Sequence, residues 1–413
     1  MRASAVLLAL ASGVAACNAA TPAAPLSSPS APAPASAAAE PSASPTMSLT
    51  PTPAASRQPA GDLGREIEVG SLDPAWTTPT LEFASDGESI IFSSGVADGP
   101  DAEHAPDLWR YHPSTDAPEL LWHNPRRDHV LPRIGGEFGT WAFVDMPTSG
   151  ERAWDFWLLP AAGAQAILLD SHPGDESVPD FVPSFTVHQA QIAWTSFDRG
   201  PSGAVSQLRY ARAPDWQPVV LAERDARTAE LWFPSLRDTE VAYSEVVYSP
   251  DRSTDERRVF VLNAAVPDVP PRRLDSTGQA TMPLLLLNGG VAWKEADPGF
   301  SMLNWGHMFL FDEDTSDVAA LPTRPQEYVN YPSGGARFVA AWGADSRAFG
   351  VYDLDLRATR LIDRWPPETS VNVLRPHISG SLLTWLHAEV DGLGNGPDPE
   401  IRFAFMPAPG EDR

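Results

Sequence analysis

The chain has 413 residues, and its 54 acidic side chains outnumber the 29 basic ones, which gives a formal net charge of −25. This charge argues against nucleic acid or an anionic lipid surface as a partner recognised by charge, because both require clustered positive side chains. The single cysteine, Cys17, excludes an intrachain disulfide framework and a zinc site built from cysteines.

The first 16 residues have the pattern of a secretion signal, with Arg2 followed by an apolar run and then by small residues. The apolar run is too short to span a bilayer. The four residues that end at Cys17 resemble the lipobox of bacterial lipoproteins, and they are Val14, Ala15, Ala16 and Cys17. This resemblance implies that Cys17 is lipidated and becomes an N-terminus held in membrane lipid. The alternative is an ordinary secretion signal with an incidental cysteine.

Residue Asn18 follows the cysteine, and by similarity to enterobacterial lipoproteins it implies sorting to the outer membrane. We therefore expect a bacterial cell-envelope protein that faces the periplasm or the cell surface. Residues 17–61 are almost all Ala, Pro, Ser and Thr, a composition that cannot bury a core, and they predict a disordered tether. Such a tether spans roughly 35 Å as a coil and at most about 135 Å in the polyproline conformation.

The remaining part, residues 62–413, repeats one pattern seven times: a proline followed by a short apolar segment that ends in an aromatic side chain. The clearest copy is Gln191–Trp194, which follows Pro183. The other copies are Ser89–Phe92, Phe138–Trp141, Glu240–Tyr243, Gly290–Trp293, Val339–Trp342 and Leu382–Trp385. The corresponding prolines, Pro79, Pro132, Pro183, Pro234, Pro283, Pro332 and Pro376, stand 44 to 53 residues apart. Repeats of this length belong to single closed arrays, so we predict one domain.

Each repeat contains short apolar runs bounded by Gly, Pro, Asp and Ser, as in residues 191–197, 207–211 and 218–222 of the third repeat. Such runs predict strands. The fold class expected is therefore all-β: a seven-bladed β-propeller of four-stranded antiparallel blades, preceded by a disordered linker. The seventh repeat is one strand short, and we expect Glu66–Val69 to supply the missing strand and close the ring. The recurring aromatic residues are expected on the second strand of each blade, packed between blades.

The first repeat also carries a family resemblance, in Phe83–Gly87 and Ile90–Phe92. These residues resemble the repeat of TolB-like propellers, which reads aromatic, Ser, Pro, Asp, Gly, two variable residues, Ile, Ala, aromatic. The other repeats keep only the proline and the aromatic-ended strand, so the resemblance, over roughly residues 75–405, is specific mainly for the fold. It implies an envelope propeller with protein partners. No partner-binding residue can be transferred, because the family's contact residues lie outside the matched motif.

Function is expected in the loops of one face. In a propeller the connections between blades and those between the second and third strands lie together on this face, around the mouth of the central channel. For partner binding, the candidates in these connections are Arg126, Arg127, His129, His172, Trp305, His307, Arg375 and His377. Two similar loops of the first and seventh repeats would supply oxygen ligands to calcium, namely Asp98, Asp101, Glu103, Asp398 and Glu400. Each set has a plainer interpretation as solvated loops and turns.

No Gly-x-Ser-x-Gly elbow, His-Glu-x-x-His motif or phosphate-binding Gly-rich loop is present. We therefore expect a membrane-anchored lipoprotein whose propeller binds a protein or an envelope component, with calcium as the one candidate cofactor and no nucleic acid partner. Two alternatives remain open at this point. One is an enzyme, a polysaccharide lyase or hydrolase with its site at the channel mouth, and the other is a structural envelope lipoprotein without a discrete ligand.

Overall fold

The computed structural model describes residues of the repeat region, all of which belong to the compact unit Pro51–Arg413. The described ranges are 67–72, 82–94, 107–115, 117–123, 129–137, 139–147, 153–161, 163–174, 178–179, 181–252, 255–287, 289–296, 306–321, 330–335, 337–346, 348–366, 369–390 and 399–407. Within them every regular element is a β-strand, and no helix is long and apolar enough to cross a membrane.

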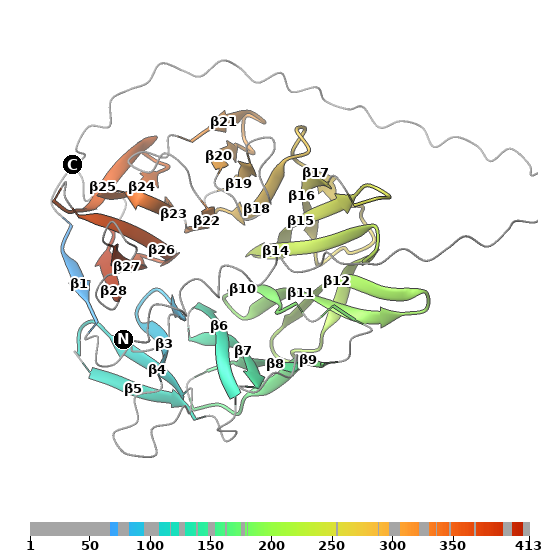
Figure 1. Cartoon of the computed structure of the whole chain (residues 1–413), viewed down its shortest axis with the longest axis horizontal. Helices are drawn as coiled ribbons and strands as arrows, with labels where there is room; N and C mark the ends of the chain where they lie inside the picture. The colour runs from blue at the N-terminus through green and yellow to red at the C-terminus, as the bar shows by residue number, and fades with distance from the viewer. Residues whose placement is uncertain are drawn as a thin grey trace, which may run out of the picture. The chain divides into compact units, whose positions relative to one another are not determined.

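The strands form seven four-stranded antiparallel blades arranged as a ring (Figure 1). Blade 1 contains β2 (Phe83–Ser85), β3 (Ile90–Ser94), β4 (Asp107–His112) and β5 (Ala117–Trp122). Blade 2 contains β6 (His129–Glu137), β7 (Thr140–Pro147), β8 (Ala153–Leu159) and β9 (Ile167–Pro173). Blade 3 contains β10 (Ser184–His188), β11 (Gln191–Gly200), β12 (Gly203–Arg212) and β13 (Val219–Asp225).

The chain continues around the ring in the same order. Blade 4 contains β14 (Ala229–Arg237), β15 (Glu240–Tyr248), β16 (Asp255–Asn263) and β17 (Arg272–Arg273). Blade 5 contains β18 (Ala280–Leu285), β19 (Val291–Ala296), β20 (Gly306–Phe311) and β21 (Val318–Ala320). Blade 6 contains β22 (Asn330–Gly334), β23 (Phe338–Ser346), β24 (Ala348–Asp353) and β25 (Ala358–Arg364). Blade 7 contains β26 (Ser370–Ser379), β27 (Leu382–Val390), β28 (Glu400–Phe405) and β1 (Val69–Ser71).

The predicted closure by an N-terminal strand is confirmed. Strand β1 pairs antiparallel with β28 from Val69↔Ala404 to Ser71↔Arg402, and it completes blade 7. The strand lies further along the chain than the expected Glu66–Val69, with Val69 as the one residue in common. A Cβ atom at Gly70 would stand 2.3 Å from the ring of Phe403, so a larger residue there would displace that ring.

The first strands of neighbouring blades contact one another around the ring, so they form its inner wall. Five of them, β6, β14, β18, β22 and β26, contain a β-bulge, and a repeat proline lies inside each bulge. Proline has no N–H to donate to a ladder, and a bulge leaves a residue unpaired, so the two features occur together. Before three of these prolines, Phe233, Met282 and Arg375 adopt positive φ. The repeat proline therefore marks the irregularity of the inner strand.

The recurring aromatic residues lie on the second strands, as predicted. Those whose side chains are described are at most 1% exposed: Phe92, Trp141, Trp194, Tyr243, Trp293 and Trp385. Each packs against the preceding blade; for example, the Trp194 ring meets Phe156 of blade 2 with centroids 5.7 Å apart. In blade 2 the expected register is wrong by two residues. The turn of blade 3 closes at His188↔Gln191, and Trp194 stands three positions after Gln191. The turn of blade 2 closes at Glu137↔Thr140, so the residue three positions after it is Phe143 and not Trp141.

Polar side chains join the inner strands from one blade to the next. Ser235 Oγ accepts the N–H of Leu285 at 2.9 Å, and Ser333 Oγ accepts the N–H of Ile378 at 3.0 Å. Arg237 donates to the carbonyl oxygen atoms of Leu286 and Gly290 at 2.9 and 3.2 Å. These bonds satisfy backbone groups that blade packing removes from water, and they hold adjacent blades in register.

Candidate functional site

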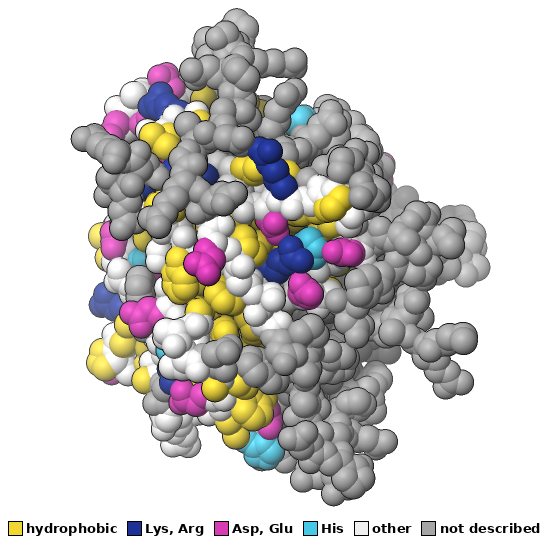
Figure 2. Space-filling model, turned by 90° about the vertical axis from the view of Figure 1, so that its left-hand side faces the viewer, with side chains coloured by type: hydrophobic (Ala, Val, Ile, Leu, Met, Phe, Trp, Pro, Cys, Tyr) yellow, Lys and Arg dark blue, Asp and Glu magenta, His cyan; other side chains and the backbone are white. Residues whose placement is uncertain are grey.

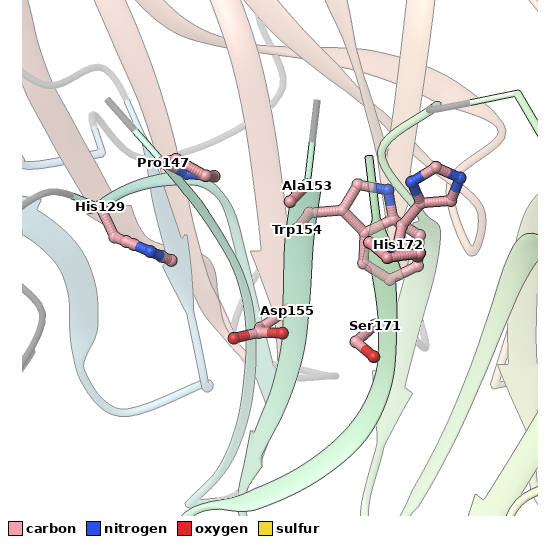
Figure 3. Close-up of a pocket in the computed structure, with 8 residues that line it drawn as sticks. His129, Pro147, Ala153, Trp154, Asp155, Ser171 and His172 are labelled. Carbon is pink, nitrogen blue, oxygen red and sulfur yellow. The ribbon is translucent and has the colours of Figure 1, made fainter. Parts of the chain in front are cut away.

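We use the term loop face for the side of the ring that carries the connections between blades and those between second and third strands. In blade 2, β6 begins opposite the end of β7 (His129↔Pro147), and β8 begins opposite the end of β9 (Ala153↔Pro173), so these four strand ends meet on the loop face. A cavity of about 260 Å³ lies there (Figure 3). Its lining consists of His129, Pro147, Ala153, Trp154, Asp155, Ser171, His172 and Pro173. We call it the blade 2 cavity.

Two acidic side chains stand on neighbouring strands at the blade 2 cavity, and of these Asp155 lines it. Asp145 of β7 and Asp155 of β8 are direct cross-strand partners, so both carboxylates project from the same face of the blade. Asp145 is 2% exposed, whereas Asp155 is half-buried. His129 Nδ1 lies 3.4 Å from Asp145 Oδ1. Like charges placed directly opposite destabilise a strand pair, and a cationic group bound between these side chains would relieve that repulsion.

The second histidine of the cavity is fixed by the protein itself. His172 is 4% exposed, its Nδ1 accepts the N–H of Gly174 at 3.0 Å, and its ring stacks on Trp154 with centroids 5.8 Å apart. Because Nδ1 accepts, the proton of the neutral ring is on Nε2. Figure 3 shows His129 and His172 on opposite sides of the cavity. The structure thus brings together two candidates that were expected in separate connections and lie at the loop-face ends of β6 and β9.

Two further candidates occupy inner-strand positions of blade 7. Arg375 pairs with Glu82 of blade 1. Burial raises the pKa of the Glu82 carboxyl, and the adjacent Arg375 acts in the opposite direction. His377 is inside the ring wall, where its Nδ1 accepts the N–H of Ser85 at 3.2 Å. Both side chains have contacts within the protein that account for their positions without a ligand.

His307 is exposed at the start of blade 5 strand β20, opposite Glu295. Glu400 begins β28, where it accepts a hydrogen bond from Arg402 Nε at 3.2 Å. The other candidates, Cys17, Arg126, Arg127, Trp305, Asp98, Asp101, Glu103 and Asp398, lie outside the described residues. Blades 1 and 7 are neighbours, as the calcium hypothesis requires. In the part of the chain that the structure describes, no group of three His, Cys, Asp or Glu side chains could hold a metal ion.

A second polar cluster on the loop face was missed by the sequence reasoning. Glu230, at the start of β14, accepts hydrogen bonds from the Tyr248 hydroxyl at 2.8 Å and from Trp232 Nε1 at 3.2 Å. Burial raises the pKa of Glu230, and these two donors act against that effect. The guanidinium of Arg252 lies 4.5 Å from the ring centroid of Tyr248. The sequence signal that could have indicated this cluster is the Trp232-Phe233 pair before Pro234. Two adjacent aromatic residues on a strand point to opposite faces, so one of them points away from the core.

Beneath this cluster the connections of blades 2 to 4 are held by a small apolar core of Val178, Phe197 and Ala226, against which Phe181 and Trp232 pack. The rings of Phe181 and Trp232 are 5.4 Å apart and nearly perpendicular. Elsewhere, on the side of the molecule in Figure 2, acidic and basic side chains alternate with apolar ones over the described surface. The loop face of blades 2 to 4 thus carries both the blade 2 cavity and the Glu230 cluster.

No family model and no curated protein matches this sequence. Several solved structures share its fold. The oligogalacturonate lyase of Vibrio parahaemolyticus aligns with a TM-score of 0.52 at 10% identity, over 83% of this chain and 94% of that one. The β-propeller domain of the Trilobed protease from Pyrococcus furiosus, described as having an open velcro topology, aligns with a TM-score of 0.54 at 9% identity, over 80% and 92%. The polysaccharide lyase Uly1 aligns with a TM-score of 0.50 at 8% identity, over 79% and 90%.

These identities establish likeness of fold alone, since propellers support many unrelated functions. The class of protein that the fold defines is a seven-bladed β-propeller. Unlike the Pyrococcus furiosus domain described as open, this ring is closed by pairing between β1 and β28.

Proposed function

We propose that this chain is a lipid-anchored cell-envelope protein whose propeller binds a protein or another envelope component through its loop face. Cys17, in its lipobox-like sequence, is the site of lipidation, and residues 17–61 are the tether that holds the propeller away from the membrane. The resemblance of the first repeat to TolB-like propellers supports an envelope role with protein partners. Attachment is to the outer membrane, on its periplasmic or its outer side.

The observation that carries the binding proposal is the blade 2 cavity. It opens on the loop face and combines the partly exposed Asp155 carboxylate and His129 with apolar walls from Pro147 and Pro173. A concave site with a few convergent polar groups is the usual form of a recognition site. Its volume of about 260 Å³ suits a single side chain or small polar head group of a larger partner.

Anchoring is tested by replacing the cysteine. Cells that express the wild-type chain or Cys17→Ser are labelled with radioactive palmitate and then separated into membrane and soluble fractions. We expect label and membrane association in the wild type and neither in the variant. A Cys17→Ser protein that stays in the membrane fraction would refute lipid anchoring without affecting the binding proposal.

Binding is tested by capture from detergent extracts of the envelope, with the wild type compared to His129→Ala and Asp155→Asn. The matched control is Asp314→Asn, because this exposed carboxylate lies on the turn between β20 and β21, on the opposite face of the ring. We expect a specific partner to be lost with both cavity variants and retained by the control. Equal capture by all four proteins would exclude the blade 2 cavity, and no specific capture would leave the structural-lipoprotein alternative.

The enzyme alternative is supported by the two polysaccharide lyases among the similar folds and by the carboxylate and histidine in one cavity. Incubation of the chain with polyuronates and neutral polysaccharides, followed by absorbance of unsaturated products and by reducing-end assay, tests it directly. Cleavage that is abolished in Asp155→Asn and preserved in Asp314→Asn would replace the binding proposal by a catalytic one.

A further inference from the structure

The inner strands of the ring are joined by a repeated hydrogen bond in which one blade supplies a side-chain acceptor and the next supplies a backbone N–H. Ser235 of blade 4 and Ser333 of blade 6 are two such acceptors. Each stands directly after a bulge proline and opposite an alanine of its second strand, Ala242 or Ala340. At the seam between blades 7 and 1, the equivalent acceptor is His377, which follows Pro376 and stands opposite Thr384.

His377 Nδ1 accepts the N–H of Ser85 at 3.2 Å, and the Ser85 hydroxyl lies within 3.2 Å of the same nitrogen while donating to the Leu382 carbonyl at 3.3 Å. A serine oxygen accepts a hydrogen bond at any ordinary pH. An imidazole nitrogen accepts only while it is unprotonated. Among the described residues, three seams have as acceptor the residue directly after a bulge proline, and of these three acceptors only His377 titrates. The carboxylate that accepts the N–H of Gln189 between blades 2 and 3 belongs to Glu137, at the far end of its inner strand.

This seam is also where the ring closes on itself. The chain enters blade 7 as β1, and it then crosses to blade 1 and begins β2. The three residue pairs between β1 and β28 and the inner contacts of β26 with β2 hold the two ends of the propeller together. On the face of the ring opposite the loop face, Gly380 of blade 7 lies against Gly87 of blade 1. A Cβ atom on Gly380 would stand 3.5 Å from the Cα atom of Gly87. Loss of the bond from Ser85 to His377 thus weakens the seam at which the two ends of the propeller meet, and not a seam between two blades in the middle of the chain.

The charged groups around His377 oppose one another. From blade 1 it faces Asp86, and from blade 2 Glu137, and both carboxylates favour the protonated ring. Burial disfavours the charged ring and has the larger effect, so the pKa of His377 is lowered to about 4. From β22 the neighbour is the uncharged Ser333. The two titratable groups of β27, His387 and Glu389, stand further along that strand, opposite Val373 and Val371. Arg375 on the same strand is paired with Glu82.

We propose that the seam between blades 7 and 1 is an acid-sensitive closure of the ring, in which protonation of His377 removes the acceptor that joins β26 to β2. At neutral pH the bond is formed and the ring is closed. On acidification the half-buried imidazolium presents an N–H toward the N–H of Ser85, and opening of the seam separates these two donors. The seams built on serine lack this response.

The test is native-state hydrogen exchange of the full chain between pH 8 and pH 5, corrected for the intrinsic pH dependence of amide exchange. If the ring has its ordinary pKa near 6.5 in the open seam and about 4 in the closed one, the opening equilibrium rises about 30-fold at pH 5 relative to pH 8. We expect this increase in segments 83–92 and 369–379, and not in the seam between blades 4 and 5. An even increase in all seams, or none, would overturn the proposal.

The matched variant is His377→Ser, which installs the acceptor used by blades 4 and 6. It is expected to keep the closed seam and lose the pH response, whereas Ser333→Ala opens the seam between blades 6 and 7 equally at all pH values. A His377→Ser chain with the wild-type pH response would contradict the proposal. If this variant does not fold, the pKa of His377 is measured by NMR in the wild type, where a value near 6.5 in the folded chain would also contradict it.

Discussion

Trp194 offers a direct test of how the ring is held together. Its side chain is fully buried between blades 2 and 3, where it meets Phe156, and its Nε1–H donates to Asp170 Oδ2 at 2.9 Å. Burial of a tryptophan side chain removes about 150 to 250 Å² from water, which at about 25 cal/mol per Å² corresponds to about 4 to 6 kcal/mol as an upper estimate. We expect Trp194→Ala to lower the free energy of unfolding by about 3 to 5 kcal/mol.

A second substitution separates packing from hydrogen bonding. Trp194→Phe introduces the residue found at the equivalent positions Phe92 and Phe143, and it removes the indole N–H. Because Asp170 keeps its ion pair with Arg209 at 3.1 Å, we expect a cost of about 1 to 2 kcal/mol.

The assay for both variants is urea denaturation followed by far-UV circular dichroism, with Leu168→Ala as control. Leu168 is 48% exposed on the outer strand of blade 2, so its truncation is expected to cost less than about 0.5 kcal/mol. If Trp194→Ala shifted the unfolding midpoint no further than Leu168→Ala does, the interblade role of the recurring aromatic residue would be wrong.

Three other predictions concern buried polar groups. Burial lowers the pKa of Lys294, the sole lysine, to about 7, so the folded chain binds fewer protons than the unfolded one between pH 7 and 10.5. The free energy of unfolding, measured in denaturation curves, should therefore rise by about 2 kcal/mol from pH 7 to pH 9, and Lys294→Met should abolish that rise. Arg237→Ala should cost about 3 kcal/mol by the same assay because Glu240 and two carbonyl groups lose a buried donor, and Arg237→Lys should not restore it, since one ammonium cannot replace a planar guanidinium. Tyr248→Phe should cost about 1 to 2 kcal/mol, since Glu230 then keeps only part of its hydrogen bonding; an unchanged midpoint would show that water replaces the hydroxyl.

Much of the fold was predictable because it rests on local, repeated signals. Short apolar runs between turn residues predicted the strands, and the period of the prolines predicted the number of blades. The Asp86-Gly87 turn of the first repeat is present between β2 and β3, with Gly87 at φ 99°. The register in blade 2 was not predictable, because Trp141 and Phe143 are both aromatic and alternate positions on a strand share one face. Hydrogen bonding across the turn, and not side-chain type, decides between them.

The candidate site was only partly predictable. His129 and His172 were selected as residues of loop-face connections. The structure places them instead at the first residue of β6 and near the end of β9, and both line one cavity. The acidic pair at that cavity was missed, since Asp145 and Asp155, of which only Asp155 lines the cavity, stand ten positions apart in the chain and become neighbours only through strand pairing. His377 was selected for the same reason, yet it lies well inside an inner strand, because β26 begins at Ser370 and continues through the bulge at Pro376.

The sequence by itself determined the all-β class, the seven blades and the need for a closing strand, since these follow from periodicity and from turn-forming residues that act over a few positions. It also supports the expectation of a lipid anchor and a tether through the residues around Cys17. Only the tertiary structure decided which polar groups meet. Residues such as His377 and Ser85 are 292 positions apart, and their contact exists because the ring brings its two ends together. Spacing along the chain carries no information about such a contact, whereas closure of the ring creates it.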